Sequence, residues 1–432
     1  MKYVVQPGGQ LSGSHRVPGD KSMSHRAVML GALAEGATEV TGFLDGDDAL
    51  ATAAAFRDMG VVIEGPTDCR MIIHGAGLQG LAPPPGSVDM GNAGTGMRLL
   101  AGILAGQPFD SRLVGDVSLM KRPMGRVIEP LAKMGAVIES GSGGVPPLQI
   151  RGGQALHGIH YDLPMASAQV KSCILLAGLF AEGRTSVTEP APTRDHTERM
   201  LRGFGYPVDR VNGVIGLDGG GGLTATQIDI PADVSSAAFF IVGASIAPGS
   251  DIVLRHVGMN PTRIGVINIL TLMGADISVL EPREVGGEPV ADLRIRHADL
   301  HGIDIPEDEV PLAIDEFPAL FIAAACARGT TTLRGAAELR VKESDRIAAM
   351  AEGLDTLGVE NEPTPDGIVI EGGTLGGGTI RTFHDHRIAM AFAMAGLRAS
   401  RAIEILDCDH VATSFPRFDH LAVQSGLKLA IG

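Results

Sequence analysis

The sequence predicts an α/β protein of two domains, each built from three similar units. Two interleaved glycine patterns support this prediction. In the first, a helical segment ends at a glycine and a strand follows, as in "LAKMGAVIES". Glycine is typical just past a helix end because it adopts left-handed backbone angles without strain. The pattern recurs six times, with these glycines 68 to 84 residues apart: Gly60, Gly135, Gly205, Gly274, Gly358 and Gly426.

The second pattern consists of apolar helices that end near "GILAGQP", "GLFAEGRT" and similar segments. Five of its six ends carry a glycine: Gly36, Gly106, Gly183, Gly249 and Gly329. Each unit therefore holds two helices and several strands. A repeat of about 70 residues exceeds the repeats of solenoid proteins, so each unit should fold as a small α/β module. Six units divide naturally into two domains of three, and the change is expected near "DIPADVSSAAFF".

Composition narrows the class of protein. The chain has 432 residues and a formal net charge of −15, which disfavours nucleic acid as a partner. No apolar run is long enough to cross a membrane, and the N-terminal "MKYVVQPGG" resembles no targeting segment. The four cysteines lack the CxxC spacing of zinc sites and are too few for a disulfide framework. We expect a cytoplasmic monomer that acts on small molecules.

Polar and charged clusters precede the first helix of each unit. Helix N-termini carry unpaired N–H groups and a partial positive charge, so they favour anions. We therefore expect these six helix starts to meet at one anion-binding cleft. The clusters are "GDKSMSHR" (19–26), "GNAGTGMR" (91–98), "MASAQVKS" (165–172), "DVSSAA" (233–238), "AIDEFP" (313–318) and "FHDHR" (383–387).

The first cluster is the most informative. Ser22 or Ser24 is expected to cap the helix, with Lys21 just outside it and Arg26 in its first turn. Simple capping would not place cations at a helix N-terminus, where the dipole opposes them, so an anionic ligand is favoured. The glycines of "GNAGTGMR" fit either a tight turn or close approach of a ligand, and the sequence leaves this open.

Other clusters have a structural and a functional interpretation. Arg122 in "KRPMGR" suits bidentate phosphate binding or a solvated surface. Ser167 and Gln169 offer neutral donors for hydroxyl groups, although helix capping explains them equally well. Arg194 in "TRDHTER" fits a solvated turn.

Two acidic segments are similarly ambiguous. "AELRVKESDR" should place Lys342 and Arg346 on one helix face, either as ligand-binding cations or as part of a salt-bridged surface. Asp315 precedes a very apolar helix, so it is either a helix cap or a catalytic carboxylate. In "FHDHR", two histidines flank an aspartate in a spacing that suits helical metal ligands poorly, so we expect no metal site.

Six motifs in order give the chain a resemblance to the 5-enolpyruvylshikimate-3-phosphate synthase family of enolpyruvyl transferases. They are "PGDKSMSHR", "GNAGTGMR", "KRPMGR", "SAQVKS", "RVKESDR" and "DHRIAM". The resemblance covers nearly the whole chain and implies two domains of three βαβαββ units, with the active site in the interdomain cleft. Because the family's chain starts and ends in one domain, we expect an N-terminal lobe of residues 19–233 and a C-terminal lobe of 1–18 plus 234–432.

The resemblance implies transfer of the enolpyruvyl group of phosphoenolpyruvate to the 5-hydroxyl of shikimate 3-phosphate, with release of phosphate. This is a step of the shikimate pathway to chorismate and the aromatic amino acids, it is the target of glyphosate, and it uses no metal or organic cofactor.

The resemblance also assigns residues to each substrate. Those implied to bind shikimate 3-phosphate are Lys21, Ser22, Arg26, Ser167, Ala168 through its backbone, Gln169, Arg194, Asp315 and Lys342. Those implied to bind phosphoenolpyruvate are Lys21, Gly94, Arg122, Gln169, Arg346 and Arg387. Asp315 is the candidate base for the 5-hydroxyl, and Lys21 and Glu343 are the candidates for moving the proton at C3 of the donor.

Two departures from the family pattern matter. Thr413 in "ATSFP" stands where some members have a lysine, so one phosphate contact is lost or replaced. Gly94 is typical of one branch and "MASAQVKS" of another, which leaves glyphosate sensitivity open.

Two alternative functions are compatible with this type of scaffold. A UDP-N-acetylglucosamine enolpyruvyl transferase would carry a reactive loop cysteine and favour asparagine where Ser22 follows Lys21. A non-catalytic anion-binding protein on the same scaffold would not need Asp315, Glu343 and Lys21 together as an acid–base set.

Overall fold

The structure is a computed structural model that describes all 432 residues. Contacts divide the chain into two compact units. The N-terminal lobe comprises Gly19–Ile230 with Val285–Gly287, and the C-terminal lobe comprises Met1–Pro18, Pro231–Glu284 and Glu288–Gly432. This division falls between residues 230 and 231, whereas the sequence placed it after residue 233.

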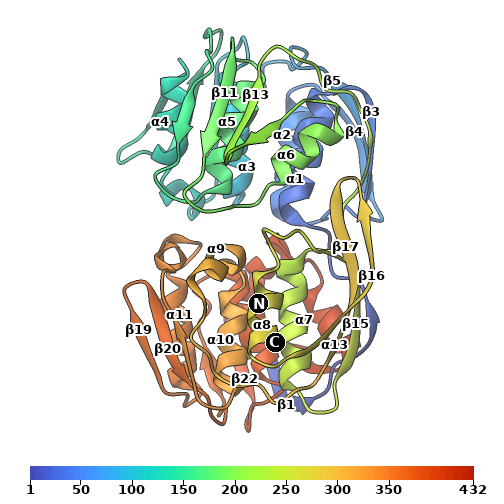
Figure 1. Cartoon of the computed structure of the whole chain (residues 1–432), viewed down its shortest axis with the longest axis vertical. Helices are drawn as coiled ribbons and strands as arrows, with labels where there is room; N and C mark the ends of the chain where they lie inside the picture. Colours follow the sequence, from blue (N-terminus) through green and yellow to red (C-terminus); the bar gives the residue numbers. More distant parts are fainter. The chain divides into compact units, whose positions relative to one another are not determined.

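The N-terminal lobe contains three four-stranded sheets of one design (Figure 1). In each sheet the first two strands are parallel and the remaining neighbours are antiparallel. The first sheet has the order β14(Gln227–Asp229), β3(Glu35–Thr41), β5(Arg70–Ala76), β4(Val62–Thr67). The second has β6(Val88–Asp89), β7(Ser111–Val114), β9(Val145–Arg151), β8(Val137–Gly141). The third has β10(His160–Asp162), β11(Arg184–Thr188), β13(Val214–Asp218), β12(Asp209–Val211).

Each sheet of this lobe carries two helices. The first helix of each unit is buried along almost its whole length, and its buried residues are mostly apolar, with a few polar exceptions such as Arg26 and Lys171. These central helices are α1(Lys21–Leu33), α3(Gly94–Ala105) and α5(Ala168–Gly178). The second helices are α2(Asp47–Asp58), α4(Gly125–Lys133), preceded by η1(Leu119–Lys121), and α6(His196–Gly203).

The C-terminal lobe repeats this plan. Its first sheet has the order β21(Gly378–Ile380), β22(Ile403–Ile405), β1(Tyr3–Gly9), β23(Leu427–Ile431), so the two ends of the chain pair in one sheet. The second has β16(Asp276–Val285), β17(Glu288–Arg296), β15(Asp251–Gly258), β2(Ser12–His15). The third has only β18(Thr330–Leu333), β20(Gly367–Glu371) and β19(Asn361–Thr364). Two isolated parallel bridges, His301–Arg328 and Asp304–Thr332, lie where a fourth strand would pair.

The helices of the C-terminal lobe follow the same division. Its buried central helices are α7(Val234–Ile246), α10(Phe317–Cys326) and α12(His386–Ala395). Its second helices are α8(Gly265–Leu272), α11(Arg346–Thr356) and α13(Phe418–Ser425). Shorter helical turns are η2(Glu307–Glu309), α9(Val310–Ala313), η3(Ala337–Val341) and η4(Cys408–Thr413). The expected α/β fold of two similar halves is therefore confirmed.

The repeated glycines have the predicted conformation with one exception. All six glycines of the first pattern have φ between 76° and 118°, the left-handed region that favours glycine. Four of the five in the second pattern do so as well, with φ between 82° and 105°. Gly106 has φ −91°, and a Cβ there would lie 2.3 Å from the ring of Phe180. Lack of space, rather than backbone angle, requires glycine at that position.

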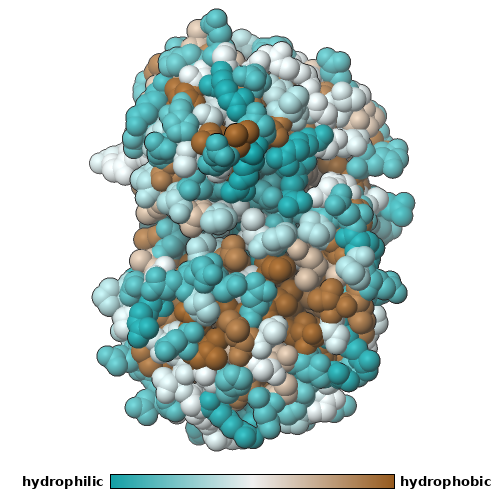
Figure 2. Space-filling view, viewed as in Figure 1, coloured by the Kyte–Doolittle hydropathy of each residue, from teal (hydrophilic) through white to brown (hydrophobic).

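Surface hydropathy differs between the lobes on the face that Figure 2 shows. Figure 2 shows hydrophobic residues gathered on the visible face of the C-terminal lobe, while that of the N-terminal lobe is mostly hydrophilic. The exposed hydrophobic side chains of the C-terminal lobe include Leu272, Val279 and Leu280. No helix in the chain has both the length and the apolar character needed to cross a membrane.

Candidate active site

The start of α1 differs in detail from the sequence prediction. Asp20 is the N-cap, and its carboxylate accepts a hydrogen bond from the Met23 amide at 2.8 Å. The prediction that Ser22 or Ser24 caps the helix is wrong. Lys21 is the first helical residue rather than a flanking one, and Arg26 lies in the second turn. An acidic cap close to a lysine lowers the cost of placing that cation at a helix N-terminus.

Lys21 has an acidic partner that the sequence did not suggest. Its ammonium forms an ion pair with Asp48, a nearly buried residue in the first turn of α2. The only signal was the acidic "DGDD" run before an apolar segment, which is also a common helix start. This pair fixes the ammonium while leaving the Lys21 side chain 22% exposed.

Arg26 holds three elements of the N-terminal lobe together. Its Nε donates to the Thr197 hydroxyl at 2.6 Å, and its Nη2 donates to the Ser172 hydroxyl at 2.8 Å. Its Nη1 donates to the Ser22 carbonyl at 2.9 Å. The side chain is only 3% exposed, so α1, α5 and α6 share one buried guanidinium.

His25 is neutral at physiological pH. Burial lowers its pKa to about 3, and the charges of Lys21 and Arg26 act in the same direction. Its Nδ1 lies 2.8 Å from the Thr52 hydroxyl of α2. His25 therefore contributes packing and a hydrogen bond rather than a proton transfer.

The start of α3 brings Gly94 against Arg122. A Cβ on Gly94 would lie 2.9 Å from Nη1 of Arg122, so the glycine leaves room for the guanidinium. Nη2 of Arg122 donates to the Asn92 side chain at 2.6 Å, and the Asn92 amide in turn donates to Asp116 at 2.7 Å. Sequence reasoning missed Asn92 and Asp116, although both lie within or beside quoted motifs.

The start of α5 presents hydroxyl and amide groups. Ser167 caps the helix and accepts from the Val170 amide at 3.4 Å. Gln169 reaches α3, where its Oε1 accepts from Arg98 at 2.6 Å and its Nε2 donates to Thr95 at 2.9 Å. The Ser167 and Gln169 side chains are half-buried, so a ligand could still reach them.

In the C-terminal lobe, Asp315 lies beside two cations. Its Oδ1 is 3.3 Å from the Lys342 ammonium and 3.4 Å from Nη1 of Arg346. The prediction that Lys342 and Arg346 share a helix face is wrong: Lys342 has extended backbone after η3, Asp345 is the N-cap, and α11 begins at Arg346. The two cations meet at Asp315 because the chain turns between them.

Arg346 is the most enclosed cation of this lobe, with 1% of its side chain exposed. Its Nη2 donates to Glu343 at 2.6 Å and its Nε to Asp385 at 2.8 Å. Burial alone would lower the Arg346 pKa, but the charges of these carboxylates raise it. Burial likewise works against ionisation of Asp385, and the Arg346 guanidinium outweighs it, so the Asp385 pKa is lowered.

Arg387 lies in the first turn of α12, which Asp385 caps by accepting from the Arg387 amide at 2.9 Å. Its Nη1 donates to the Asp315 carbonyl at 2.8 Å, so the half-buried guanidinium is oriented by the start of α10. Thr413 offers no replacement for the lysine of some relatives, because its hydroxyl donates to the His410 carbonyl at 2.7 Å.

The charged helix starts therefore differ from a simple cluster of cations. Lys21, Lys342 and Arg346 each contact a carboxylate. Arg387 lies 3.7 Å from the Glu316 carboxylate and also donates to the Asp315 carbonyl, and Arg122 donates to the neutral Asn92 side chain. Such partners hold cations in fixed positions before a ligand arrives, which is the arrangement that stabilises developing negative charge most effectively. No group of three or more histidine, cysteine, aspartate or glutamate side chains is arranged to hold a metal ion.

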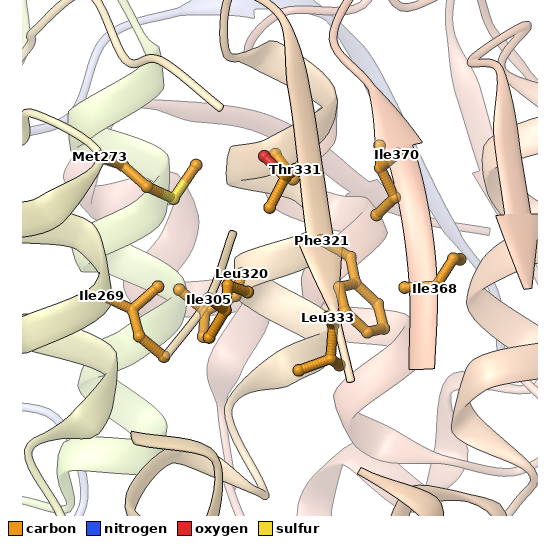
Figure 3. A pocket seen from close by; sticks show the side chains of 10 residues that line it. Ile269, Met273, Ile305, Leu320, Phe321, Thr331, Leu333, Ile368 and Ile370 are labelled. Carbon is orange, nitrogen blue, oxygen red and sulfur yellow. The ribbon is translucent and has the colours of Figure 1, made fainter. Parts of the chain in front are cut away.

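Two cavities within the lobes are lined by other residues than these. A gap of about 10 Å³ lies in the core of the C-terminal lobe. Figure 3 shows the mainly aliphatic side chains that line it, such as Ile269, Leu320 and Leu333. It is too small for a phosphorylated metabolite. A groove of about 720 Å³ in the N-terminal lobe lies at the C-terminal ends of α1, α3 and α5, opposite their charged starts.

The chain has two halves of three similar units, with fixed cations, hydroxyls and partly exposed carboxylates at or beside their helix starts. These features define a class of two-lobed enzymes for small acidic metabolites. Comparison with known proteins identifies the family within this class. The model of the family described as EPSP synthase (3-phosphoshikimate 1-carboxyvinyltransferase) matches residues 5–421.

Relatives and solved structures agree with this match. A 3-phosphoshikimate 1-carboxyvinyltransferase of Methylococcus capsulatus is 65% identical over 99% of this chain and 98% of its own length. That of Alkalilimnicola ehrlichii is 66% identical over 100% of this chain and 97% of its own. A structure of EPSP synthase from Acinetobacter baumannii has 58% identity and a TM-score of 0.91 over the full length of both chains.

The chain belongs to the EPSP synthase family. It is a transferase of the shikimate pathway, in which the enolpyruvyl group passes from phosphoenolpyruvate to shikimate 3-phosphate. The functional class predicted from the six motifs is thereby confirmed.

Proposed function

We propose that the helix starts of both lobes bind the two substrates of this transfer together, and that Asp315 is its general base. Both substrates carry a carboxylate and a phosphate, so fixed cations and N–H groups are the chemistry that recognises them. The proposed shikimate 3-phosphate contacts are Lys21, Ser22, Arg26, Ser167, Ala168, Gln169, Arg194, Asp315 and Lys342. The proposed phosphoenolpyruvate contacts are Lys21, Gly94, Arg122, Gln169, Arg346 and Arg387.

The position of Asp315 is the observation that supports the proposal most strongly. Its side chain is 14% exposed and lies between Lys342 and Arg346 at 3.3 and 3.4 Å. A general base must be oriented by its surroundings and still be reachable by the proton it accepts. Asp315 meets both conditions.

For the acceptor, the start of α5 offers the Ser167 hydroxyl, the Gln169 amide and the free N–H end of a helix. Ala168 is the first helical residue, so its amide has no partner four residues earlier within the helix and can donate to a phosphate oxygen. Arg194 precedes the next helix start, at Asp195. These groups suit the phosphate and ring hydroxyls of shikimate 3-phosphate.

For phosphoenolpyruvate, the donor, Arg122 and Gly94 are proposed to form one binding surface. The glycine leaves space for the guanidinium and for a ligand beside it, while Asn92 fixes the guanidinium plane. In the C-terminal lobe, Arg346 and Arg387 supply two more planar cations that match carboxylate and phosphate oxygens.

The reaction proceeds by addition and then elimination. The 5-hydroxyl oxygen attacks C2 of phosphoenolpyruvate while its proton passes to Asp315, and C3 accepts a proton, giving a tetrahedral intermediate. Phosphate then leaves C2 as C3 loses a proton, which restores the double bond in the enolpyruvyl ether. The fixed arginines stabilise charge on the departing phosphate. The mechanism requires no metal or organic cofactor.

Lys21 and Glu343 are the candidates for adding and removing the C3 proton. Each is half-buried and contacts an opposite charge, Asp48 for Lys21 and Arg346 for Glu343. Exchange of the C3 hydrogens of phosphoenolpyruvate with D₂O, in the presence of shikimate 3-phosphate, reports this step. We expect Lys21→Met and Glu343→Gln to slow the exchange; normal exchange in either variant removes that residue from the step.

A steady-state phosphate-release assay with different acceptors tests the proposed substrate. We expect phosphate with shikimate 3-phosphate and none with UDP-N-acetylglucosamine. Release only with the nucleotide sugar would assign the alternative transferase, and release with neither would assign a non-catalytic binding protein.

Three further properties stay predictions. We propose a cytoplasmic location and a monomeric state, and size-exclusion chromatography with light scattering measures the second. Glyphosate sensitivity is open, because Gly94 and the α5 start follow different branches of the family. Inhibition against phosphoenolpyruvate concentration measures it directly.

A further inference from the structure

Lys171 is a fully buried cation that the proposed mechanism does not use. It lies in α5, two residues after Gln169, and its side chain is 0% exposed. A buried ammonium is costly unless it is paired and hydrogen-bonded, so its presence between the apolar Val170 and Cys173 calls for a specific role.

The partners of Lys171 come from one short segment. Its Nζ lies 3.0 Å from Glu189 Oε1 and 2.8 Å from Glu198 Oε1, and both glutamates are at least 97% buried. The same ammonium donates to the carbonyl of Thr193 at 3.4 Å, and the Thr193 hydroxyl donates to Glu189. The lysine thus contacts the start of the segment between β11 and α6 at Glu189, its interior at Thr193, and the first turn of α6 at Glu198.

That segment carries Arg194. The Thr193 carbonyl held by Lys171 belongs to the peptide bond that joins Thr193 to Arg194, so fixing it fixes the backbone from which the arginine projects. The adjacent Ser172 makes a parallel link, since its hydroxyl accepts from Thr197 and from Arg26 at 2.8 Å each. The buried side of α5 therefore orients groups that flank its ligand-facing start.

We propose that Lys171 is a positioning residue that holds Arg194 in place for shikimate 3-phosphate. The inference rests on the proposed role of Arg194. Holding the segment before the ligand arrives reduces the ordering that binding would otherwise require, and so favours affinity for the acceptor. A lysine that only neutralises Glu189 and Glu198 would affect folding stability but not the acceptor selectively.

The first variant is Lys171→Met, which keeps the volume and removes the charge. We expect the KM for shikimate 3-phosphate to rise by about 10- to 100-fold, with the KM for phosphoenolpyruvate changed by less than about threefold. The exposed Lys133→Met is the matched control and should change neither constant. An unchanged acceptor KM in a folded Lys171→Met enzyme overturns the proposal.

A second variant separates positioning from folding, because the buried Glu189 and Glu198 carboxylates lose their shared ammonium in Lys171→Met and the variant could fail to fold; the only cation that Glu189 keeps is Arg210, at 4.0 Å. Lys171→Met combined with Glu189→Gln and Glu198→Gln removes both carboxylate charges together with the ammonium. We expect its melting temperature to recover towards wild type while the acceptor KM stays raised. Recovery of both quantities would show that Lys171 acts only through stability and would overturn the proposal.

Comparison with Arg194→Ala completes the test. In this test the triple variant is combined with Arg194→Ala. If Lys171 acts through Arg194, the combined variant should have an acceptor KM less than about threefold above that of Arg194→Ala alone, well below the product of the two separate effects. Independent, multiplicative effects overturn the positioning proposal. An unchanged acceptor KM in Arg194→Ala alone instead overturns the proposed role of Arg194, so the two failures are distinguishable.

Discussion

Replacing Gly94 by alanine tests the proposed donor site with a single methyl group. The added Cβ would lie 2.9 Å from Nη1 of Arg122, about 0.5 Å inside the 3.4 Å at which ordinary contacts begin. The end of the flexible Arg122 side chain must shift, and its 2.6 Å hydrogen bond to Asn92 is the contact that we expect this shift to weaken. The backbone is not the obstacle, since Gly94 begins α3 and lacks a left-handed φ.

The hydrogen bond between Arg122 and Asn92 determines how large the effect on the phosphoenolpyruvate KM should be. A hydrogen bond to a charged group contributes about 1.5–3 kcal/mol, so misplacing Arg122 should raise the phosphoenolpyruvate KM by about 10- to 100-fold. The acceptor KM should change by less than about threefold, since Gly94 has no proposed contact with shikimate 3-phosphate. Steady-state phosphate release, with each substrate varied in turn, measures both constants.

Gly203→Ala is the matched control for this experiment. Gly203 ends α6, has open space around its would-be Cβ and lacks a left-handed φ, so alanine there should leave both constants unchanged. An unchanged donor KM in Gly94→Ala would refute the argument that this glycine makes room for Arg122. An equal rise in both KM values would instead indicate a general distortion of the lobe.

The remaining predictions concern charge. Asp315→Asn should lower kcat by about 10²- to 10⁴-fold with little change in either KM, and near-normal turnover would remove Asp315 as the base. Arg122→Ala should mainly raise the donor KM; a selective rise in the acceptor KM would contradict its assignment. His25 is neutral in the fold, with a pKa of about 3, but gains a proton below 6.5 when unfolded, so stability is lost as the pH falls. Between pH 7 and pH 4.5, wild type should therefore lose about 2–3 kcal/mol more than His25→Gln. Urea denaturation at both pH values measures the difference, and equal losses would contradict a buried neutral histidine.

The repeat architecture was readable from the sequence because glycine positions are set by local backbone geometry. Gly60 and its five equivalents need left-handed angles wherever a helix turns into a strand, so the sequence records each turn directly. Gly106 shows the limit of this reasoning, since only the packing of Phe180 explains it. The pairing of the N-terminal strand β1 with the C-terminal strand β23 joins the two ends of the chain. No local sequence feature indicates this pairing.

The site was predictable in its residue types but not in its contacts. Motifs placed Lys21 and Asp315 near helix starts, and the structure finds them there, whereas Arg346 was expected within a helix and instead begins one. Their partners come from distant segments: Asp48 for Lys21, and Asp385 for Arg346. A lone acidic residue at a helix start looks like an ordinary cap, so only tertiary structure distinguishes an ion-pair partner from a cap.

Local propensity also misplaced one helix. The charges of "AELRVKESDR" suggested a continuous helix with Lys342 and Arg346 one turn apart, whereas the chain forms a short 3₁₀ turn that ends at Val341 and starts a new helix at Arg346, capped by Asp345. The Asp345 side chain, which accepts from the Ala348 amide at 3.0 Å, offers a helix start that competes with helix continuation.

A crystal structure with shikimate 3-phosphate and a non-reactive phosphoenolpyruvate analogue tests the central claim most directly. We predict one acceptor molecule within hydrogen-bond distance of Ser167, Gln169 and Asp315, with the analogue against Arg122 and Arg387. An acceptor that binds one lobe only, with the Asp315 carboxylate out of reach of its 5-hydroxyl, would contradict both the shared site and the assigned base.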